Sequence, residues 1–523
     1  MKTTKTVKLI SVLLALIMLS ALFTPAFAYA ADSGEALPLI CLPGFAAIPI
    51  VANDGQANET NVFPPGLDSL GNITSKLTDI LRGIGTTEPL FTAINAVLEP
   101  LLCDEKGTPL DTGITVKSFD SSFAGYGFDD GLWDYTRAYG VLSGRKIGAD
   151  KVYLYSFDWR LDVLEAGNGL AEFIDKVLAE TGAGKVNIVA SSMGASVAYS
   201  YAAQNDAHAK AKVNNLIMAN SAIKGTSLIG DLFKGDFFIT AAGLAGLAGS
   251  LTDSNDFLYM LAQTLVHTLL WGVKATNLEN NAILKQLRED FYAQTAIPIF
   301  ANFTGLWSMI PDEDADEAFA FMFPKGADPE VKAKILEYYA LRAQAEDVLS
   351  GLMDAGVKLA VISNYGSNML PVVKTDSIHS DTVIDTKYTS LGATCSSLNG
   401  TLPKGYTQAR ACCGYDHVSP DNAIDASTCM FADITWFIKN LGHNAPYAVG
   451  EKPVDLIMWL LESEEQQYVW SNEDFPQFLS YDKKTGGMKP VGQDAEACGG
   501  ILGFFRRVFQ IFLKVVNYVL RLY

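Results

Sequence analysis

The chain has 523 residues, of which 49% are apolar and 19% charged. That balance supplies a large core and excludes an intrinsically disordered protein. The formal net charge of −19 opposes binding to phosphate backbones, so we expect no nucleic-acid partner. The length fits one large α/β domain with insertions, or two to three domains.

The first 30 residues have the order of a secretory signal peptide. Three lysines precede an apolar run from Leu9 to Phe23, and small residues follow up to Ala30. The run of roughly 15 residues is shorter than the ~20 that a membrane-spanning helix needs. We therefore expect cleavage after Ala28 or Ala30 and a secreted or extracellular protein; an N-terminal anchor that stays attached is the alternative.

The number and spacing of the cysteines and histidines limit which disulfides and metal sites the chain can form. Four of the seven cysteines lie between residues 395 and 429, so an exported chain is expected to form a disulfide there, with the connectivity open. The odd count leaves at least one thiol unpaired within a monomer. The chain has five histidines and no C-x-x-C pair, so we expect no zinc site, and no metal or other cofactor.

The hydrophobic pattern predicts a parallel sheet with crossover helices. A short apolar strand is expected at 38–42, whereas the pattern at 52–148 does not predict a clear order of elements. Between 150 and 220 the pattern then alternates: strands at 151–157, 185–190 and 213–218, helices at 161–178 and 194–204. Strands that alternate with helices in this way are typical of parallel sheets.

Apolar helical stretches dominate residues 228–355, and a strand pattern resumes at 358–363. We therefore predict an α/β-hydrolase core at 31–227 and 356–445, interrupted by a helical cap at 228–355. A helix is expected at 431–441, near the end of this core. Residues 446–500 are assigned to a C-terminal extension.

The strand at 185–190 leads directly into Ala190-Ser191-Ser192-Met193-Gly194, and a helix follows. This is a small-x-Ser-x-Gly nucleophile elbow, in which the residues two places from the serine must be small because the turn is tight. The pattern predicts Ser192 as a nucleophile, with the backbone N–H of Met193 facing a developing oxyanion. A serine that only caps a helix is the structural alternative.

A second oxyanion donor is expected from a loop that follows an earlier strand. Gly44 ends the first strand and lets the backbone bend, so that Phe45 or Ala46 can offer its N–H. An ordinary strand-ending turn is the alternative.

A serine nucleophile needs a base and an orienting carboxylate, which in this fold class follow in the order serine, acid, histidine. Asp381 follows the strand after the cap and is the predicted acid, with Asp385 as the alternative. His417 lies in a polar loop ahead of the helix expected at 431–441 and is the predicted base. His443, which follows that helix, is expected to interact with its C-terminus, although its assignment as the base stays open.

These motifs resemble those of the lecithin:cholesterol acyltransferase family of α/β-hydrolases and its lipase-like microbial relatives. Four segments between residues 38 and 440 carry the resemblance: Pro43-Gly44-Phe45, Phe157-Asp158-Trp159-Arg160, Ala190-Ser191-Ser192-Met193-Gly194 and Leu306-Trp307-Ser308-Met309-Ile310-Pro311. The second segment matches the family's Y-D-W-R with Phe in place of Tyr, and the elbow follows about thirty residues later.

The resemblance implies a lipid esterase, lipase or O-acyltransferase that acts on acyl-ester lipids through an acyl-serine intermediate. Ser192, Asp381 and His417 would form its triad, with Phe45 and Met193 as oxyanion donors. Asp158 and Arg160 would pair to brace a loop near the site, unless they form an ordinary surface ion pair. The alternative function is an inactive exported protein that binds a surface or carbohydrate and retains the hydrolase fold.

Residues 501–523 form a basic apolar segment at the end of an acidic chain. Its polar residues recur every three or four positions, which predicts an amphipathic helix that lies in a membrane interface. Peripheral membrane or cell-surface association is one expectation, and packing of the apolar face against protein is the other. The sequence does not indicate the oligomeric state.

Overall fold

The structure is a computed structural model that describes residues 36–81, 84–126, 147–236, 282–370, 378–411, 414–443, 451–482 and 485–492. The expected signal peptide, residues 237–281 of the expected cap and the expected amphipathic helix at 501–523 lie outside the described residues.

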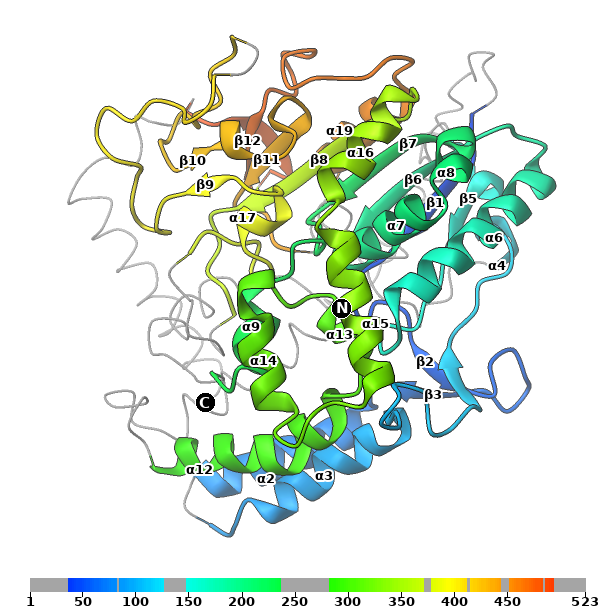
Figure 1. Ribbon diagram of the computed structural model, residues 1–523, viewed down its shortest axis with the longest axis vertical. Helices are drawn as coiled ribbons and strands as arrows, with labels where there is room; N and C mark the ends of the chain where they lie inside the picture. The colour runs from blue at the N-terminus through cyan, green and yellow to red at the C-terminus, as the bar shows by residue number, and fades with distance from the viewer. Residues whose placement is uncertain are drawn as a thin grey trace, which may run out of the picture. The chain divides into compact units, whose positions relative to one another are not determined.

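In the described part of the chain, an eight-stranded sheet has the order β13-β12-β11-β8-β7-β6-β1-β5 (Figure 1). In chain order its strands are β1 (Leu39–Leu42), β5 (Val152–Leu154), β6 (Val186–Ser191), β7 (Val213–Ala219), β8 (Lys358–Tyr365), β11 (Thr435–Lys439), β12 (Phe478–Asp482) and β13 (Gly487–Pro490). Neighbouring strands are parallel except β12 and β13, which pair antiparallel. The carboxyl ends of the parallel strands therefore meet at one edge.

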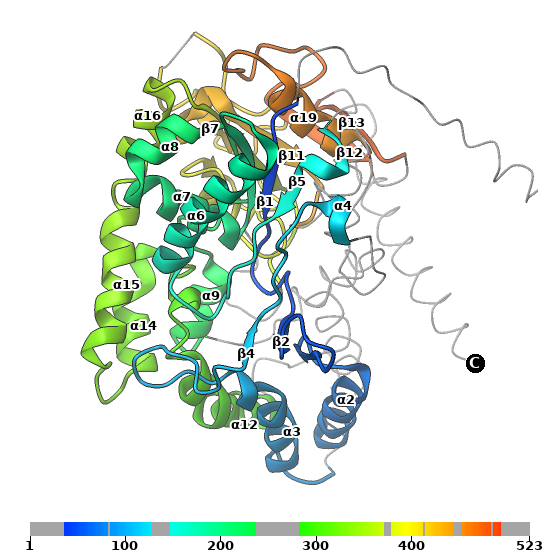
Figure 2. The ribbon, with the colours of Figure 1, turned by 90° about the vertical axis from the view of Figure 1, so that its right-hand side faces the viewer.

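The central strands are apolar on both faces because helices cover both sides of the sheet. All residues of β1 and β6 are buried. Figure 2 shows α6 (Val163–Thr181), α7 (Met193–Gln204), α8 (Asp206–Lys212) and α16 (Ala345–Asp354) on one face, with α4 (Phe123–Tyr126) and α19 (Glu451–Glu462) on the other. The predicted strands and helices between 150 and 220 are confirmed, with ends shifted by up to three residues.

Helix α6 begins and ends at residues suited to those positions. The side chain of Asp162 accepts a hydrogen bond from the Leu164 N–H at the first turn, and Gly182 ends the helix with φ 70°. Gly167 lets α6 approach α7 closely, since a Cβ there would lie 2.6 Å from Tyr201 N.

The prediction of a helix at 431–441 is wrong, because Thr435–Lys439 form β11, which lies between β8 and β12. Its β-branched and aromatic residues suit a buried strand better than a helix. The region assigned to a C-terminal extension also joins the sheet, because it supplies α19, β12 and β13. The sheet is therefore completed near residue 490 instead of residue 440.

Helical segments of the expected cap lie on the side of the sheet's carboxyl edge (Figure 1), and the segment around α13 (Thr304–Trp307) is bonded to loops at this edge. These segments include α9 (Ser227–Phe233), α12 (Ala282–Phe291), α13, α14 (Ala315–Met322) and α15 (Pro329–Arg342). Gly305 N donates to Arg160 O at 3.1 Å, and Thr226 N donates to Met309 O at 2.8 Å. These bonds fix α13 and the turn after it against the loops that follow β5 and β7.

The remaining described elements lie outside the main sheet. They are α2 (Leu67–Leu81), α3 (Glu88–Leu98), α17 (Thr386–Thr389), the sheet β3-β2-β4 (Thr60–Phe63, Ile50–Ala52, Ile114–Val116), the pair β10-β9 (Ile424–Asp425, Thr394–Cys395), the 3-10 turns η1 (Glu99–Leu101), η3 (Ala149–Lys151), η5 (Asp312–Asp314), η6 (Ala426–Thr428) and η7 (Ala432–Ile434), and the π-helical turn η4 (Tyr292–Phe300). None of the helices described is long and apolar enough to cross a membrane.

Four of the seven cysteines lie within the described ranges, and all four are free thiols: Cys41, Cys103, Cys395 and Cys429. Burial raises the pKa of Cys103 and of Cys395 to about 12, so both thiols are protonated at neutral pH. The other three cysteines lie outside the described residues.

Candidate active site

Ser192 occupies the turn between β6 and α7. Its φ of 52° and ψ of −126° lie outside the regions that L-residues ordinarily adopt. Such strain is typical of a nucleophile elbow, where it lifts the side chain above the sheet edge. Crowding explains the small neighbours: a Cβ on Gly194 would lie 2.5 Å from the carbonyl oxygens of Leu42 and Pro43.

The loop after β1 lies directly beside the candidate nucleophile. A Cβ on Gly44 would lie 2.7 Å from Ser192 Cβ and 3.0 Å from its Oγ. Phe45 follows Gly44 in this loop, and Met193 is the first residue of α7. Of the two predicted oxyanion donors, Phe45 therefore follows a residue that lies against the Ser192 side chain, and Met193 follows Ser192 itself. Their role as donors stays a prediction.

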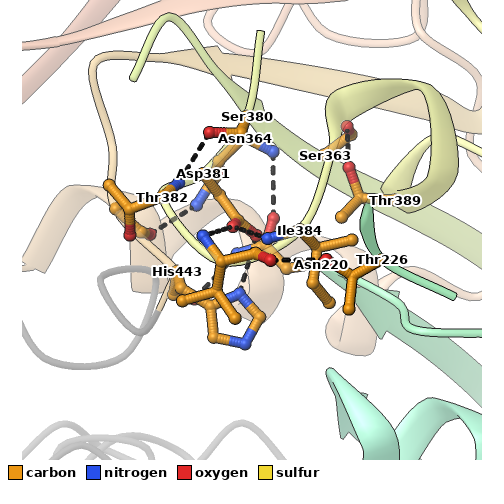
Figure 3. Close-up of polar contacts among 12 residues, drawn as sticks. Asn220, Thr226, Ser363, Asn364, Ser380, Asp381, Thr382, Ile384, Thr389 and His443 are labelled. Carbon is orange, nitrogen blue, oxygen red and sulfur yellow. Dashed lines mark hydrogen bonds and ion pairs between the residues drawn. The ribbon is translucent and has the colours of Figure 1, made fainter. Parts of the chain in front are cut away.

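Asp381 is fully buried in the segment that follows β8. Its Oδ1 accepts hydrogen bonds from Val383 N at 2.9 Å and from Ile384 N at 2.7 Å. These two N–H groups hold the carboxylate so that Oδ2 faces His443 (Figure 3). Asp381 thus lies at the carboxyl edge of the sheet, as the sequence predicts for the acid.

The alternative acid, Asp385, has a different partner. Its carboxylate accepts from Ser227 N at 2.8 Å and from Ser227 Oγ at 2.7 Å. Burial raises the pKa of Asp385 despite these hydrogen bonds. Its contacts fix the start of α9 and do not include a histidine among the bonds described.

The structure places His443, and not His417, against the acid. His443 Nδ1 lies 2.7 Å from Asp381 Oδ2, and its side chain is 9% exposed. As a carboxylate, Asp381 accepts the Nδ1 proton, which leaves Nε2 of the ring as a proton acceptor. The expected pairing of Asp381 with His417 is therefore corrected.

His417 is buried at another location. Its Nδ1 lies 2.8 Å from Gln477 Oε1, and its Nε2 lies 3.3 Å from Asp433 Oδ1. The Gln477 amide donates to the carbonyls of Ala432 and Thr435, so its oxygen is free to accept from His417. These contacts connect three segments of the chain around β11, which is a structural role.

The expected pairing of Asp381 with His417 follows from the helix wrongly predicted at 431–441. If residues 431–441 were a helix, His443 would lie beyond its end and His417 would precede it. Because 435–439 form a parallel strand, His443 instead follows the carboxyl end of that strand. The β-branched and aromatic run Ile434-Thr435-Trp436-Phe437-Ile438 was the signal in the sequence that could have indicated this.

Asp158 and Arg160 form a buried pair in the loop after β5. Arg160 Nη2 lies 2.6 Å from Asp158 Oδ2, and the arginine side chain is 0% exposed. The guanidinium also donates to Leu101 O and Ile114 O, each at 3.1 Å. The pair therefore connects this loop to residues 101–114 and is not an ordinary surface ion pair.

Trp159, between these two residues, packs under the loop after β1. Its ring contacts Phe45 with a centroid distance of 4.6 Å and Phe303 with a distance of 5.9 Å. The loop with a predicted oxyanion donor thus rests on an aromatic side chain that also contacts the segment before α13.

No protein-family model matches the chain, and a search of curated proteins finds no relative. Solved structures with some similarity include a chain of the Tle4–Tli4 complex, at 13% identity and a TM-score of 0.25, covering 64% of this chain and 75% of that one. A carboxylesterase structure from the thaumarchaeon Nitrososphaera gargenis has 17% identity and a TM-score of 0.19 over 47% of this chain and 68% of that one. An Acinetobacter baumannii AYE protein assigned as a lipase has 14% identity and a TM-score of 0.14 over 40% and 80%.

These scores are too low to indicate a function, so the fold is assigned from the topology. A mostly parallel sheet has a strained serine after β6, a buried carboxylate after β8 and a histidine after β11. In the described residues no group of three or more His, Cys, Asp or Glu side chains could hold a metal ion. The chain has the α/β-hydrolase fold.

Proposed function

We propose that this protein is a serine-dependent carboxylic ester hydrolase or O-acyltransferase, with Ser192 as nucleophile, His443 as base and Asp381 as the orienting acid. The observation that supports this best is the 2.7 Å contact between His443 Nδ1 and Asp381 Oδ2 at the sheet edge that carries Ser192. Serine, acid and histidine also follow one another in the chain order of this fold class.

In the proposed acylation step, Ser192 Oγ attacks the carbonyl carbon of the ester while its proton passes to His443 Nε2. Asp381 stabilises the resulting imidazolium through the Nδ1 hydrogen bond. The backbone N–H groups of Phe45 and Met193 stabilise the oxyanion. When the tetrahedral intermediate collapses, the alcohol leaves with the proton from His443 and the acyl group remains on Ser192.

In the deacylation step, water or an acceptor alcohol gives its proton to His443 and attacks the acyl-serine. The second collapse returns the proton to Ser192 Oγ and releases an acid or a new ester. Both outcomes use the same residues, so the choice between hydrolysis and acyl transfer depends on which acceptor reaches the acyl group.

We propose acyl-ester lipids as the substrate class. Support comes from the motifs shared with the lecithin:cholesterol acyltransferase family and from the expected amphipathic segment at 501–523. We further propose that the protein is exported and acts at a lipid surface. A series of nitrophenyl esters of rising chain length, followed by phospholipid and sterol acceptors, would define the acyl length and the acceptor.

A fluorophosphonate probe tests the nucleophile. We expect the wild-type protein to gain the mass of one adduct on Ser192 and the Ser192→Ala variant to gain none, with its fold unchanged by circular dichroism. Ester hydrolysis by Ser192→Ala at the wild-type rate would reject the proposal. An unlabelled and inactive wild-type protein would favour the alternative of a binding protein that retains the fold.

A pair of histidine variants tests the base. His443→Ala should lower kcat by about three to four orders of magnitude, because the proton acceptor is lost. His417→Ala should leave kcat within about tenfold but reduce the free energy of unfolding by about 1–3 kcal/mol, since it removes a buried hydrogen bond. Steady-state kinetics and urea unfolding of both variants give the ranking. The reverse order in kcat would return the base to His417.

A further inference from the structure

Two asparagines hold the main chain of the residues that carry the candidate base. Asn220 Nδ2 donates to His443 O at 2.8 Å, and Asn364 Nδ2 donates to Gly442 O at 2.9 Å (Figure 3). The two asparagines also contact each other, because Asn364 N donates to Asn220 Oδ1 at 2.9 Å. The carbonyls of two successive residues, 442 and 443, are thus fixed from the end of β7 and from β8.

Asn220 lies in a segment that is hydrogen-bonded both to the main chain of His443 and to the main chain of Ser192. Asn220 follows β7, in the turn whose residues Ala219 and Ala222 bind the main chain of Ser192. Ala219 O accepts from Ser192 N at 3.1 Å, and Ala222 N donates to Ser192 O at 3.0 Å. A single short turn therefore holds the backbone of Ser192 on one side and the backbone of His443 on the other.

His443 itself lies outside any regular element. It follows β11 by four residues, and residues 444–450 lie outside the described part of the chain. Its side chain reaches Asp381 only if the backbone at 442–443 keeps its position. The Asn440 N–H, which donates to Tyr365 O at 2.8 Å, fixes the start of this segment, and the two asparagines fix its end.

Each of the two buried asparagines has an unusual feature: the backbone conformation of Asn220 and the hydrogen bonding of Asn364. Asn220 is 1% exposed and has φ 48°, a left-handed conformation that is uncommon outside glycine and that asparagine adopts more readily than most other residues. Asn364 is 0% exposed, and its Oδ1 has no hydrogen-bond partner among the described residues. A buried acceptor without a partner is destabilising, and such exceptions are typical of functional sites.

We propose that Asn220 and Asn364 are positioning residues, which hold His443 against Asp381 and at a fixed position relative to Ser192. This inference rests on the proposed function for its kinetic consequences. Its geometric consequence, a hydrogen bond between His443 and Asp381 that persists only while both asparagines are present, can be measured without any substrate.

The test compares three variants. Asn364→Leu keeps the approximate size of the side chain and removes the donor to Gly442 O. Asn220→Gly removes the donor to His443 O, and glycine adopts a φ of 48° without strain. Asn215→Leu is the matched control: Asn215 is also buried and also donates to a backbone carbonyl, Leu461 O, but it lies in the amino-terminal half of β7.

Proton NMR reports the hydrogen bond directly. The proton between His443 Nδ1 and Asp381 Oδ2 should give a downfield resonance, assigned by its disappearance in Asp381→Asn. We expect it in the wild-type protein and in Asn215→Leu, and we expect it to broaden or vanish in Asn364→Leu and Asn220→Gly. Urea unfolding of all variants shows whether they are folded under these conditions.

Kinetics provide the second measurement. With a soluble nitrophenyl ester, Asn364→Leu and Asn220→Gly should lower kcat by about 10- to 100-fold, since small displacements of a catalytic group have effects of this size. Their KM should change by less than about threefold, because neither residue is expected to bind the substrate. Asn215→Leu should retain kcat within about twofold, although it also loses a buried hydrogen bond.

The outcomes separate this inference from the proposed function. A resonance that persists unchanged in either Asn364→Leu or Asn220→Gly overturns the inference whatever the activity, and so does its absence from the wild-type protein or an equal loss in Asn215→Leu. If the wild-type protein shows the resonance but reacts with neither ester nor fluorophosphonate, the proposed function fails. Loss of the resonance in the two variants would then still support the positioning role.

Discussion

At the scale of single residues, buried charges in this protein are satisfied largely by backbone groups. Arg342 is 0% exposed, donates to Ser308 O at 3.3 Å and to Ile310 O at 2.9 Å, and lies 4.4 Å from the ring centre of Tyr339. It thereby fixes the turn after α13 to α15. Arg342 also forms an ion pair with Asp312, and removing this partner is costly because the buried guanidinium is left without its counter-charge.

Asp162 is a buried carboxyl that forms no ion pair among the described residues, and its stability contribution should depend on pH. Its side chain caps α6, and burial raises its pKa from 3.8 to about 6. Because the pKa is higher in the folded protein, the contribution of Asp162 to stability is complete below about pH 4 and is lost as the pH rises through 6. Asp162→Asn retains a capping oxygen and removes this loss.

We therefore expect Asp162→Asn to gain about 1–3 kcal/mol in free energy of unfolding over the wild-type protein between pH 4 and pH 7. Urea unfolding at pH 4, 5, 6 and 7 measures the difference. Asp328→Asn is a matched control for removing the charge of a capping aspartate, because Asp328 caps α15 with its side chain in a half-buried position. A difference for Asp162→Asn that does not change with pH would contradict the prediction.

At the scale of elements, glycines set how closely the cap helices approach the sheet edge. A Cβ on Gly305 of α13 would lie 2.2 Å from Trp159 O and 2.8 Å from Met193 Cε. The position of α13 therefore depends on the loop that carries Trp159, and Trp159 in turn supports Phe45. A shift of α13 should therefore also move the loop after β1, which carries the predicted oxyanion donor Phe45.

Gly305→Ala should lower both stability and activity. Overpacking of this kind costs about 1–3 kcal/mol, and displacement of the Phe45 loop should reduce kcat by at least about tenfold. Gly351→Ala on α16 is the matched control, since its nearest contact would be Lys210 Nζ at 3.5 Å. There alanine should be neutral or stabilise the helix by up to about 1 kcal/mol. Thermal unfolding and ester kinetics of both variants test this, and equal effects would count against a role for the α13 contact.

At the scale of the whole molecule, the charge of the chain is divided unevenly. The net charge is −19, yet residues 501–523 carry four basic residues and no acidic one. We propose that this segment binds lipid surfaces, where a basic face is attracted to anionic lipid and an apolar face enters the interface.

Deleting residues 501–523 should leave hydrolysis of a small soluble ester unchanged, because the proposed triad and the described sheet precede residue 493. The same deletion should weaken binding to anionic vesicles, since each buried apolar side chain contributes roughly 1.5–3 kcal/mol. Vesicle flotation of both proteins measures the binding. As a control, the four basic residues of this segment are changed to glutamine in the full chain. This variant should lose mainly the salt-dependent part of its binding to anionic vesicles. Equal flotation of the intact and truncated proteins would mean that the segment packs against protein.

The sequence by itself determined the parallel core and the elbow that carries Ser192, the proposed nucleophile. Strand and helix periods between 150 and 220 are local signals, and they predicted β5 to β7 and α6 to α7 within three residues. The elbow at Ser192 is local too, because steric crowding restricts the neighbours along the chain. The place of Asp381 after β8 is also set locally, since two backbone N–H groups from the next three residues hold its carboxylate.

Only the tertiary structure decided which histidine lies against Asp381. Residues 435–439 become a strand because β8 and β12 offer partners on both sides, and these partners come from distant parts of the chain. Once β11 forms, His443 lies at the carboxyl edge, and the side chains of Asn220 and Asn364 hold it there. His417 and His443 differ little in local sequence character. The difference between them lies in which parallel strand ends beside Asp381, and long-range pairing sets that, not local propensity.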